Sequence, residues 1–288
     1  MKPSSHYLQC HGFNIHFTAW GNPSLPVVIA WHGLARTGRD FDALAEQLCP
    51  YYRVICPDTI GRGLSQWSHS PKEDYSFATY TRIALDLLDA LQIKQAHWIG
   101  TSMGGALGLM CAAAIELPSF KGRITSLLLN DIAPEISTIA VDRIKAYAGQ
   151  PPTFDSVPEL EVFFRQAYAP FGQLSDAQWR HLTETSIRRL PDGRVTPHYD
   201  PQITQQFFRE VPEYPMWHAY DALDIPVMVM RGINSDLISR DTLQTMHTRG
   251  PGLKGMLRCE EIAGCGHAPA LNMPEQWTLV MDFLKASS

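Results

Sequence analysis

The chain has 288 residues, which is enough for one large domain or two modest ones. Its apolar share of 45% and charged share of 18% are ordinary for a globular protein and exclude a disordered chain. The net charge is −5, so there is no basic excess to neutralise a phosphate backbone, and we expect no nucleic-acid partner.

The amino terminus and the cysteines indicate the compartment. Met1–Cys10 lacks the charged start, apolar run and cleavage site of a signal peptide. The longest apolar stretch, Gly104–Ile115, is far shorter than the roughly 20 residues that cross a bilayer. Six scattered cysteines without a C-x-x-C pair favour reduced thiols over a disulfide framework or a zinc site. We therefore expect a cytoplasmic protein with no membrane span, metal or cofactor.

Short strand patterns and helical patterns alternate along the chain. Residues 7–10 and 13–20 predict an antiparallel hairpin at one edge of a sheet. Nearly continuous apolar runs predict strands buried on both faces of a parallel sheet, at 27–31, 53–56, 97–99, 126–129 and 227–230. Helical spacing appears over 77–91, behind a cap at Ser76, and again after Pro274. The alternation predicts an α/β fold with a mostly parallel, doubly wound sheet.

This alternation stops between residues 134 and 215. Here apolar residues adopt helical spacing without strand-like runs, and repeated prolines divide the segment into short pieces. We interpret 134–215 as a helical lid inserted between two parts of one core, residues 1–133 and 216–288, rather than as an independent domain.

The clearest chemical signal is the turn Gly100-Thr101-Ser102-Met103-Gly104, between a predicted strand and a helix of small residues. A sharp strand-to-helix turn forces the serine into a strained backbone conformation and raises its side chain above the sheet. Glycines two residues before and after it let the backbone pack closely. The pattern predicts Ser102 as a nucleophile.

A serine hydroxyl needs a base to remove its proton and a third group to orient that base. We expect the chain order serine, acid, histidine. His267, in a glycine-flanked loop near the carboxyl end, is the predicted base. Asp236, shortly after the strand at 227–230, is the predicted acid because of its position before His267. Asp131, directly after the strand at 126–129, is the alternative, and its other interpretation is a turn or helix cap.

The turn after the first parallel strand is predicted to supply a backbone amide that stabilises negative charge on the substrate. Gly33 allows the chain to turn back over the strand ends, and the backbone amides of Leu34 and Met103 are predicted to bind an oxyanion. We interpret the neighbouring His32 as a hydrogen-bonded structural residue. Arg36 is predicted to form a salt bridge, with binding of a substrate carboxylate as the alternative.

A second strand-to-loop turn follows at Pro57–Ser65, where Asp58 is predicted to fix the loop through backbone amides. Together these motifs resemble the α/β-hydrolase fold superfamily, specifically its capped, esterase-like and lactonase-like branch. The resemblance implies that 134–215 is the lid that follows the sixth strand. It also implies that lid aromatics can line an acyl or alcohol site: Phe163, Phe164, Tyr168, Phe171, Trp179, Tyr199, Phe207 and Phe208.

Within this superfamily, epoxide hydrolases and haloalkane dehalogenases use an aspartate as the nucleophile, and dienelactone-hydrolase-like enzymes use a cysteine. The serine at position 102 therefore argues against these three activities. We therefore expect hydrolysis of small or medium carboxylic esters or lactones through an acyl-enzyme, with a small-molecule ester as the partner. Hydrolysis of carbon–carbon bonds in ring-cleavage products and perhydrolysis use the same triad and stay open. A non-catalytic ligand receptor on the same shell is the alternative from another class. The sequence makes no prediction of oligomeric state.

Overall fold

One eight-stranded sheet organises the protein. The computed structural model describes residues 2–208 and 214–287. The strand order is β1-β2-β4-β3-β5-β6-β9-β10. The bounds are β1 (Ser4–Cys10), β2 (Phe13–Trp20), β3 (Val27–Trp31), β4 (Arg53–Pro57), β5 (Ala96–Thr101), β6 (Ile124–Asn130), β9 (Val227–Gly232) and β10 (Leu257–Ile262). The pairs β1–β2 and β2–β4 are antiparallel and the rest are parallel, which confirms the mostly parallel sheet with a hairpin at its edge.

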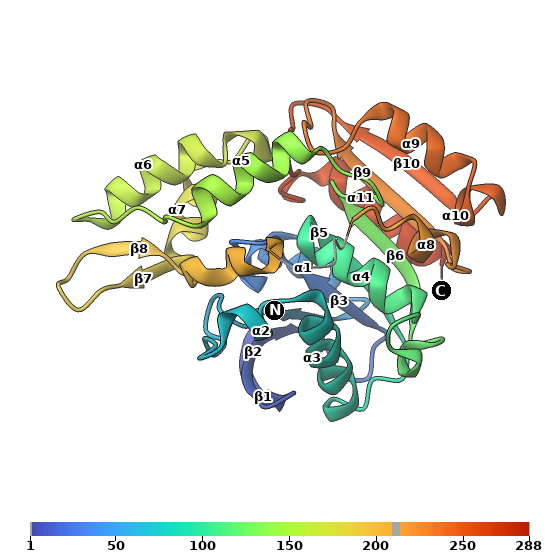
Figure 1. Ribbon diagram of the computed structural model, residues 1–288, viewed down its shortest axis with the longest axis horizontal. Helices are drawn as coiled ribbons and strands as arrows, with labels where there is room; N and C mark the ends of the chain where they lie inside the picture. Colours follow the sequence, from blue (N-terminus) through green and yellow to red (C-terminus); the bar gives the residue numbers. More distant parts are fainter. Residues whose placement is uncertain (1, 209–213, 288) are drawn as a thin grey trace.

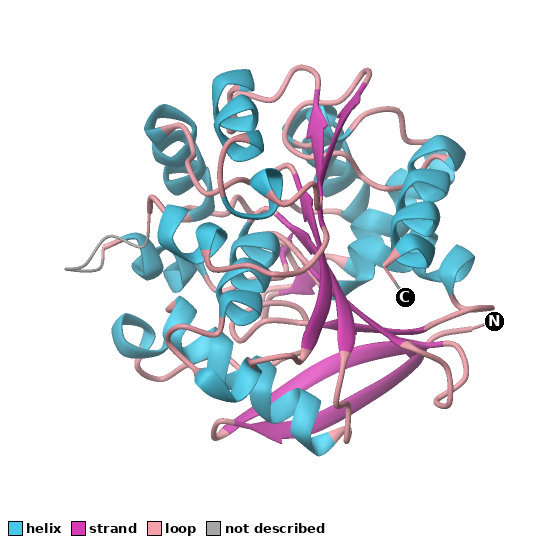
Figure 2. Ribbon diagram, turned by 90° about the vertical axis from the view of Figure 1, so that its right-hand side faces the viewer, coloured by secondary structure: helices cyan, strands magenta, loops and turns pink. Residues whose placement is uncertain are grey.

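Helices cover both faces of this sheet (Figure 2). One face packs against α3 (Phe77–Ala90), α4 (Met103–Ala113), α8 (Trp217–Asp221) and α9 (Arg240–His247), and the other against α1 (Asp42–Leu48) and α11 (Pro274–Ala286). In β6, Leu127 and Leu129 join the first core cluster, whereas Leu128 joins the second. Since successive side chains of a strand point to opposite faces, a strand covered on both sides reads as a continuous apolar run.

Short elements complete the core: η1 (Gly38–Phe41), α2 (Pro71–Asp74), η2 (Pro118–Phe120) and α10 (Gly250–Leu253). The predicted start of α3 is confirmed, since the Ser76 side chain accepts a hydrogen bond from the Thr79 amide. Pro274 occupies the first turn of α11, where a missing N–H costs nothing. The six cysteines are free thiols. Within the described chain, no helix combines the length and the apolar character needed to cross a membrane.

The segment between β6 and α8 lies at one side of the sheet (Figure 1). Its elements are α5 (Thr138–Ala148), α6 (Val157–Ala167), η3 (Ala169–Phe171), α7 (Asp176–Thr185), β7 (Ile187–Arg189), β8 (Val195–Pro197) and η4 (Pro201–Phe207). Leu160, Phe164 and Trp179 belong to a third apolar cluster within this segment. The sequence predicted helices only, because strands of three residues are too short to show a period. Residues 209–213 of the predicted lid lie outside the described residues.

The turn between β5 and α4 fixes the position of Ser102. Ser102 has φ 52° and ψ −118°, the strained conformation that the motif predicts. A Cβ atom on Gly104 would lie 2.1 Å from the backbone oxygen of Trp31, and one on Gly100 would lie 2.3 Å from that of Gly104. The two glycines are therefore needed because backbone approaches backbone there.

We expect Gly104→Ala to lower the free energy of unfolding by about 3 kcal/mol or more, because the added methyl group meets backbone that cannot move away. Urea unfolding of the purified protein measures this loss. Gly149→Ala is the matched control, since its added Cβ would lie 3.3 Å from its nearest neighbour. Equal stability of the two variants would contradict the close packing at the turn.

Candidate active site

Three side chains meet above the carboxyl ends of neighbouring parallel strands. Ser102 stands between β5 and α4, Asp131 directly follows β6, and His267 lies in the loop after β10. Open α/β sheets place their ligand sites at this edge, because loops from several strands converge there. The fold thus brings Asp131 and His267, which are more than 130 positions apart in the chain, into contact.

Hydrogen bonds join these three side chains in a line. The Ser102 Oγ lies 3.0 Å from His267 Nε2, and His267 Nδ1 lies 2.8 Å from Asp131 Oδ2. With the Nδ1 proton donated to the carboxylate, Nε2 is left to accept the serine proton. The histidine side chain is 13% exposed and the Asp131 side chain is fully buried. A base in contact with the nucleophile and oriented by a buried acid is the arrangement that activates a serine.

Asp131 is itself held by the neighbouring strand end. Its Oδ1 accepts a hydrogen bond from the Gly232 amide at 2.8 Å, and its Oδ2 accepts one from the Ser235 hydroxyl at 2.6 Å. The residue has φ 52°, a conformation in which an aspartate is tolerated better than a bulky side chain. These two hydrogen bonds satisfy both oxygens of the buried carboxylate.

The structure corrects the prediction for Asp236. Its Oδ2 lies 2.7 Å from a guanidinium nitrogen of Arg143, and both side chains are more than half exposed. The loop after β9 turns Ser235 inward, toward Asp131, and leaves the next side chain in solvent. Spacing along the chain placed Asp236 near the correct strand end but could not give the direction of its side chain.

Two backbone amides flank Ser102. Met103 begins α4, where the first N–H groups have no partner within the helix. Leu34 lies in the turn after β3, and its N–H donates no hydrogen bond to another described residue. This turn lies against the serine, since a Cβ on Gly33 would be 3.6 Å from Ser102 Cβ. The arrangement leaves amide donors beside the nucleophile, where a negative oxygen can be stabilised.

Arg62 is a buried residue of the site region that the sequence reading did not single out. Its guanidinium donates to the Leu34 carbonyl at 2.8 Å, the Tyr80 hydroxyl at 2.9 Å and Gln206 Oε1 at 3.3 Å, and it approaches Met103 Sδ at 3.5 Å. These acceptors are uncharged. The side chain therefore connects the turn after β3, the start of α4 and the inserted unit. An arginine between two glycines after a strand is the only signal that the sequence offers for it.

The structural interpretations of His32 and Asp58 are confirmed. His32 Nε2 accepts a hydrogen bond from the Thr59 amide, and His32 Nδ1 donates to the Gly33 carbonyl at 2.7 Å. Burial lowers the pKa of His32 from 6.5 to about 4, so the ring is neutral near pH 7. Asp58 accepts hydrogen bonds from the amides of Gly38 and Leu64.

A cavity of about 410 Å³ opens at Ser102. The core contributes Leu34, Phe77, Ser102, Met103, Ile132 and Leu237, and the inserted segment contributes Ile136, Thr138, Val141, Asp142, Ile144, Lys145, Gln206, Phe207 and Tyr214. Of the lid aromatics named from the sequence, Phe207 reaches this cavity. In the described part of the chain, no group of three or more His, Cys, Asp or Glu side chains is placed to hold a metal ion.

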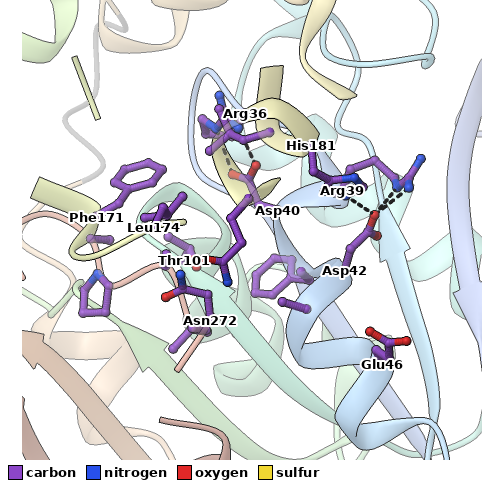
Figure 3. A pocket seen from close by; sticks show the side chains of 18 of the residues that line it. Arg36, Arg39, Asp40, Asp42, Glu46, Thr101, Phe171, Leu174, His181 and Asn272 are labelled. Atoms are coloured by element: carbon purple, nitrogen blue, oxygen red, sulfur yellow. Dashed lines mark hydrogen bonds and ion pairs between the residues drawn. The ribbon is translucent and has the colours of Figure 1, made fainter. Parts of the chain in front are cut away.

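A second cavity, of about 420 Å³, is lined by Thr101, next to Ser102, and by residues 268–272, which follow His267 (Figure 3). Thr101 and Asn272 face it from the core, and Phe171 and Leu174 face it from the inserted segment. Arg36 lines it too and forms the predicted salt bridge, with Nε 2.8 Å from Asp40 Oδ2. Ser102 is not among its lining residues, so it is distinct from the cavity at the nucleophile.

Comparisons with known proteins cover nearly the whole chain. A model of the alpha/beta hydrolase family matches residues 27–278. The chain is 37% identical over 274 residues to the 3-hydroxybutyrate-oligomer hydrolase of Cupriavidus necator, covering 92% of this chain and 90% of that protein. It is 27% identical over 249 residues to esterase YbfF of Escherichia coli, covering 84% and 85%. The solved structure of an alpha/beta hydrolase from Novosphingobium aromaticivorans is 31% identical, with a TM-score of 0.86 and 98% coverage of both chains.

The lowered pKa of His32 predicts a loss of stability in acid. As the pH falls from 6.5 to about 4, the unfolded chain binds a proton that the folded protein does not. The free energy of unfolding should therefore fall by up to about 3 kcal/mol through His32 across this window. The free energy of unfolding of the His32→Gln variant, measured by urea unfolding, should fall less over the same pH window. His97 and His198, whose pKa values burial also lowers, cancel in this comparison. If the free energy of unfolding fell equally steeply in the wild type and in the variant, the lowered pKa of His32 would be contradicted.

Proposed function

The chain belongs to the alpha/beta hydrolase family, and we propose that it is a serine hydrolase that cleaves carboxylic esters through an acyl-enzyme. The observation that carries the proposal is the line of hydrogen bonds from Ser102 through His267 to Asp131. A hydroxyl gains nucleophilic strength only when a correctly oriented base is in contact with it.

In the acylation step, the Ser102 Oγ attacks the ester carbonyl while His267 Nε2 takes the hydroxyl proton. Asp131 keeps the ring in the required tautomer and stabilises the imidazolium that forms. His267 then gives the proton to the departing alkoxide, which leaves as an alcohol. The acyl group remains on the serine as an ester.

The carbonyl oxygen becomes negative in the tetrahedral intermediate. The amides of Leu34 and Met103 bind this oxygen, and their fixed positions mean that no solvent must reorganise during the step. Arg62 supports both donors, because it holds the Leu34 carbonyl and contacts the Met103 side chain.

Water completes the cycle. His267 removes a proton from a water molecule, the resulting hydroxide attacks the acyl-enzyme, and the second intermediate collapses to release the acid. The proton on His267 returns to the Ser102 oxygen, which restores the starting state.

We infer that the esters are oligomers of 3-hydroxybutyrate, the class named for the Cupriavidus necator relative. The identity of 37% over nearly the full length of both chains supports this assignment. The mostly apolar cavity at Ser102 also supports it, because the repeating unit carries methyl and methylene groups around each ester. In this reading the segment 134–215 acts as a lid, since its residues form much of the cavity wall.

We expect Ser102→Ala to lower the turnover of the 3-hydroxybutyrate dimer by about 10⁴-fold or more, because the variant has no nucleophile. Release of 3-hydroxybutyrate, followed by chromatography, measures the rate. Ser4→Ala, on the exposed edge strand β1, is the control and should keep wild-type activity. Persistent activity of Ser102→Ala would contradict the proposal, as would a strong preference of the wild type for ring-cleavage dienones or for perhydrolysis.

The two candidate acids give a matched test. Asp131→Asn should lower kcat by about 10³- to 10⁴-fold, because the amide cannot hold the same tautomer of His267 or balance its charge. Asp236→Asn should remain near wild type, since it loses only an exposed ion pair. Thermal unfolding checks that both variants fold. Loss of activity in Asp236→Asn with retention in Asp131→Asn would overturn the assignment.

A further inference from the structure

The wall of the cavity at Ser102 carries an ion pair between the ammonium group of Lys145 and the carboxylate of Asp142. Among the described residues that line it, Lys145 of α5 is the one Lys or Arg. Most of the other described side chains that line the cavity are apolar, and Asp142 is the only carboxylate among them. The chemistry of ester cleavage described above does not involve this ammonium group.

The ion pair of Lys145 with Asp142 leaves N–H donors of the ammonium group available for a ligand. Its Nζ lies 3.1 Å from Asp142 Oδ1, an i, i+3 pair on the surface of α5. The lysine side chain is 29% exposed and the Asp142 side chain 74% exposed, and such exposed pairs contribute little to stability. An ammonium group has three N–H donors, and Asp142 uses one of them. The nitrogen also lies 5.5 Å from the ring centre of Phe207, which lines the same cavity.

Arg36 and Arg62 lie near the site, but their guanidinium groups already bind other residues. Arg36 lines the second cavity, and its guanidinium binds both carboxylate oxygens of Asp40. The Asp40 carboxylate raises the pKa of Arg36 despite its burial, so the charge is firmly paired. Arg62 is fully buried, and its donors are occupied by acceptors of the core and by Gln206 of the inserted segment. Lys145 is therefore the cation placed to meet a ligand in the cavity at Ser102.

We propose that Lys145 forms a carboxylate subsite that selects esters whose leaving group carries a terminal carboxylate. The inference rests on the proposed esterase function and deepens it. When the last ester bond of a hydroxyacid oligomer is cleaved, the departing hydroxyacid bears a carboxylate two carbon atoms from the ester oxygen. Neutral alkyl esters lack this group. A charge-assisted hydrogen bond from Lys145 fixes that end while Ser102 attacks the carbonyl.

The subsite takes no part in the bond changes. Ser102 forms the acyl bond, and His267 protonates the departing oxygen, so the carboxylate of the leaving group remains ionised throughout. Lys145 therefore acts on substrate binding, and its removal should appear in KM far more than in kcat.

The test compares two substrates that share one scissile bond: the 3-hydroxybutyrate dimer and the same dimer with its carboxylate converted to a carboxamide. Lys145→Met should raise KM for the acid dimer by about tenfold or more, because a charge-assisted hydrogen bond is lost. KM for the carboxamide should stay unchanged. Lys145→Arg should keep most of the preference for the acid, and Lys94→Met, a change at an exposed turn, should behave as wild type.

The outcomes separate this inference from the proposed function. If the wild type cleaves p-nitrophenyl butyrate but Lys145→Met changes KM equally for the acid and the carboxamide, the subsite is overturned and the esterase stands. A wild type that prefers the carboxamide overturns the subsite as well. If the wild type cleaves none of these esters, the proposed function fails and the subsite fails with it.

Discussion

The backbone of Ser102 is the constraint on which the site depends. Within one residue the chain passes from a buried strand into a helix, and φ is 52° at that point. A side chain in this region of conformational space costs roughly 1–3 kcal/mol, and the surrounding packing must hold it there. That packing is backbone against backbone at Gly100 and Gly104, next to Trp31 of β3. The same turn lifts the hydroxyl toward His267 and begins the helix whose first amide lies beside it.

Arg62 extends this constraint to the inserted segment. A buried guanidinium is stable only when its donors are satisfied, and here they are satisfied by a core carbonyl, a tyrosine hydroxyl and the side-chain amide of Gln206. Since Gln206 also lines the cavity at Ser102, the inserted segment and the turn after β3 share one anchor. Arg62 therefore links the position of the Leu34 peptide to one wall of the cavity.

The order of residues along the chain does not reveal which carboxylate contacts His267. Strands β6 and β9 are neighbours, so the loops after both strands reach the same region. Two aspartates are then available by topology, and chain order permits either. The choice depends on which side chain the loop turns inward: Ser235 takes the inward position after β9 and donates to Asp131, while Asp236 meets Arg143 in solvent.

By itself, the amino-acid sequence determined the architecture, because strands covered on both faces must be apolar throughout and helices between them must show a 3.6-residue period. It also predicted that Ser102 and His267 belong to one site, Ser102 from the glycines that a close strand-to-helix turn requires and His267 from its glycine-flanked loop near the carboxyl end. Tertiary structure decided the rest: the pairing of His267 with Asp131, the anchoring role of Arg62 and the placement of Lys145 in the cavity wall. Each of these depends on side-chain direction between segments distant in the chain, and local periodicity carries no information about that direction.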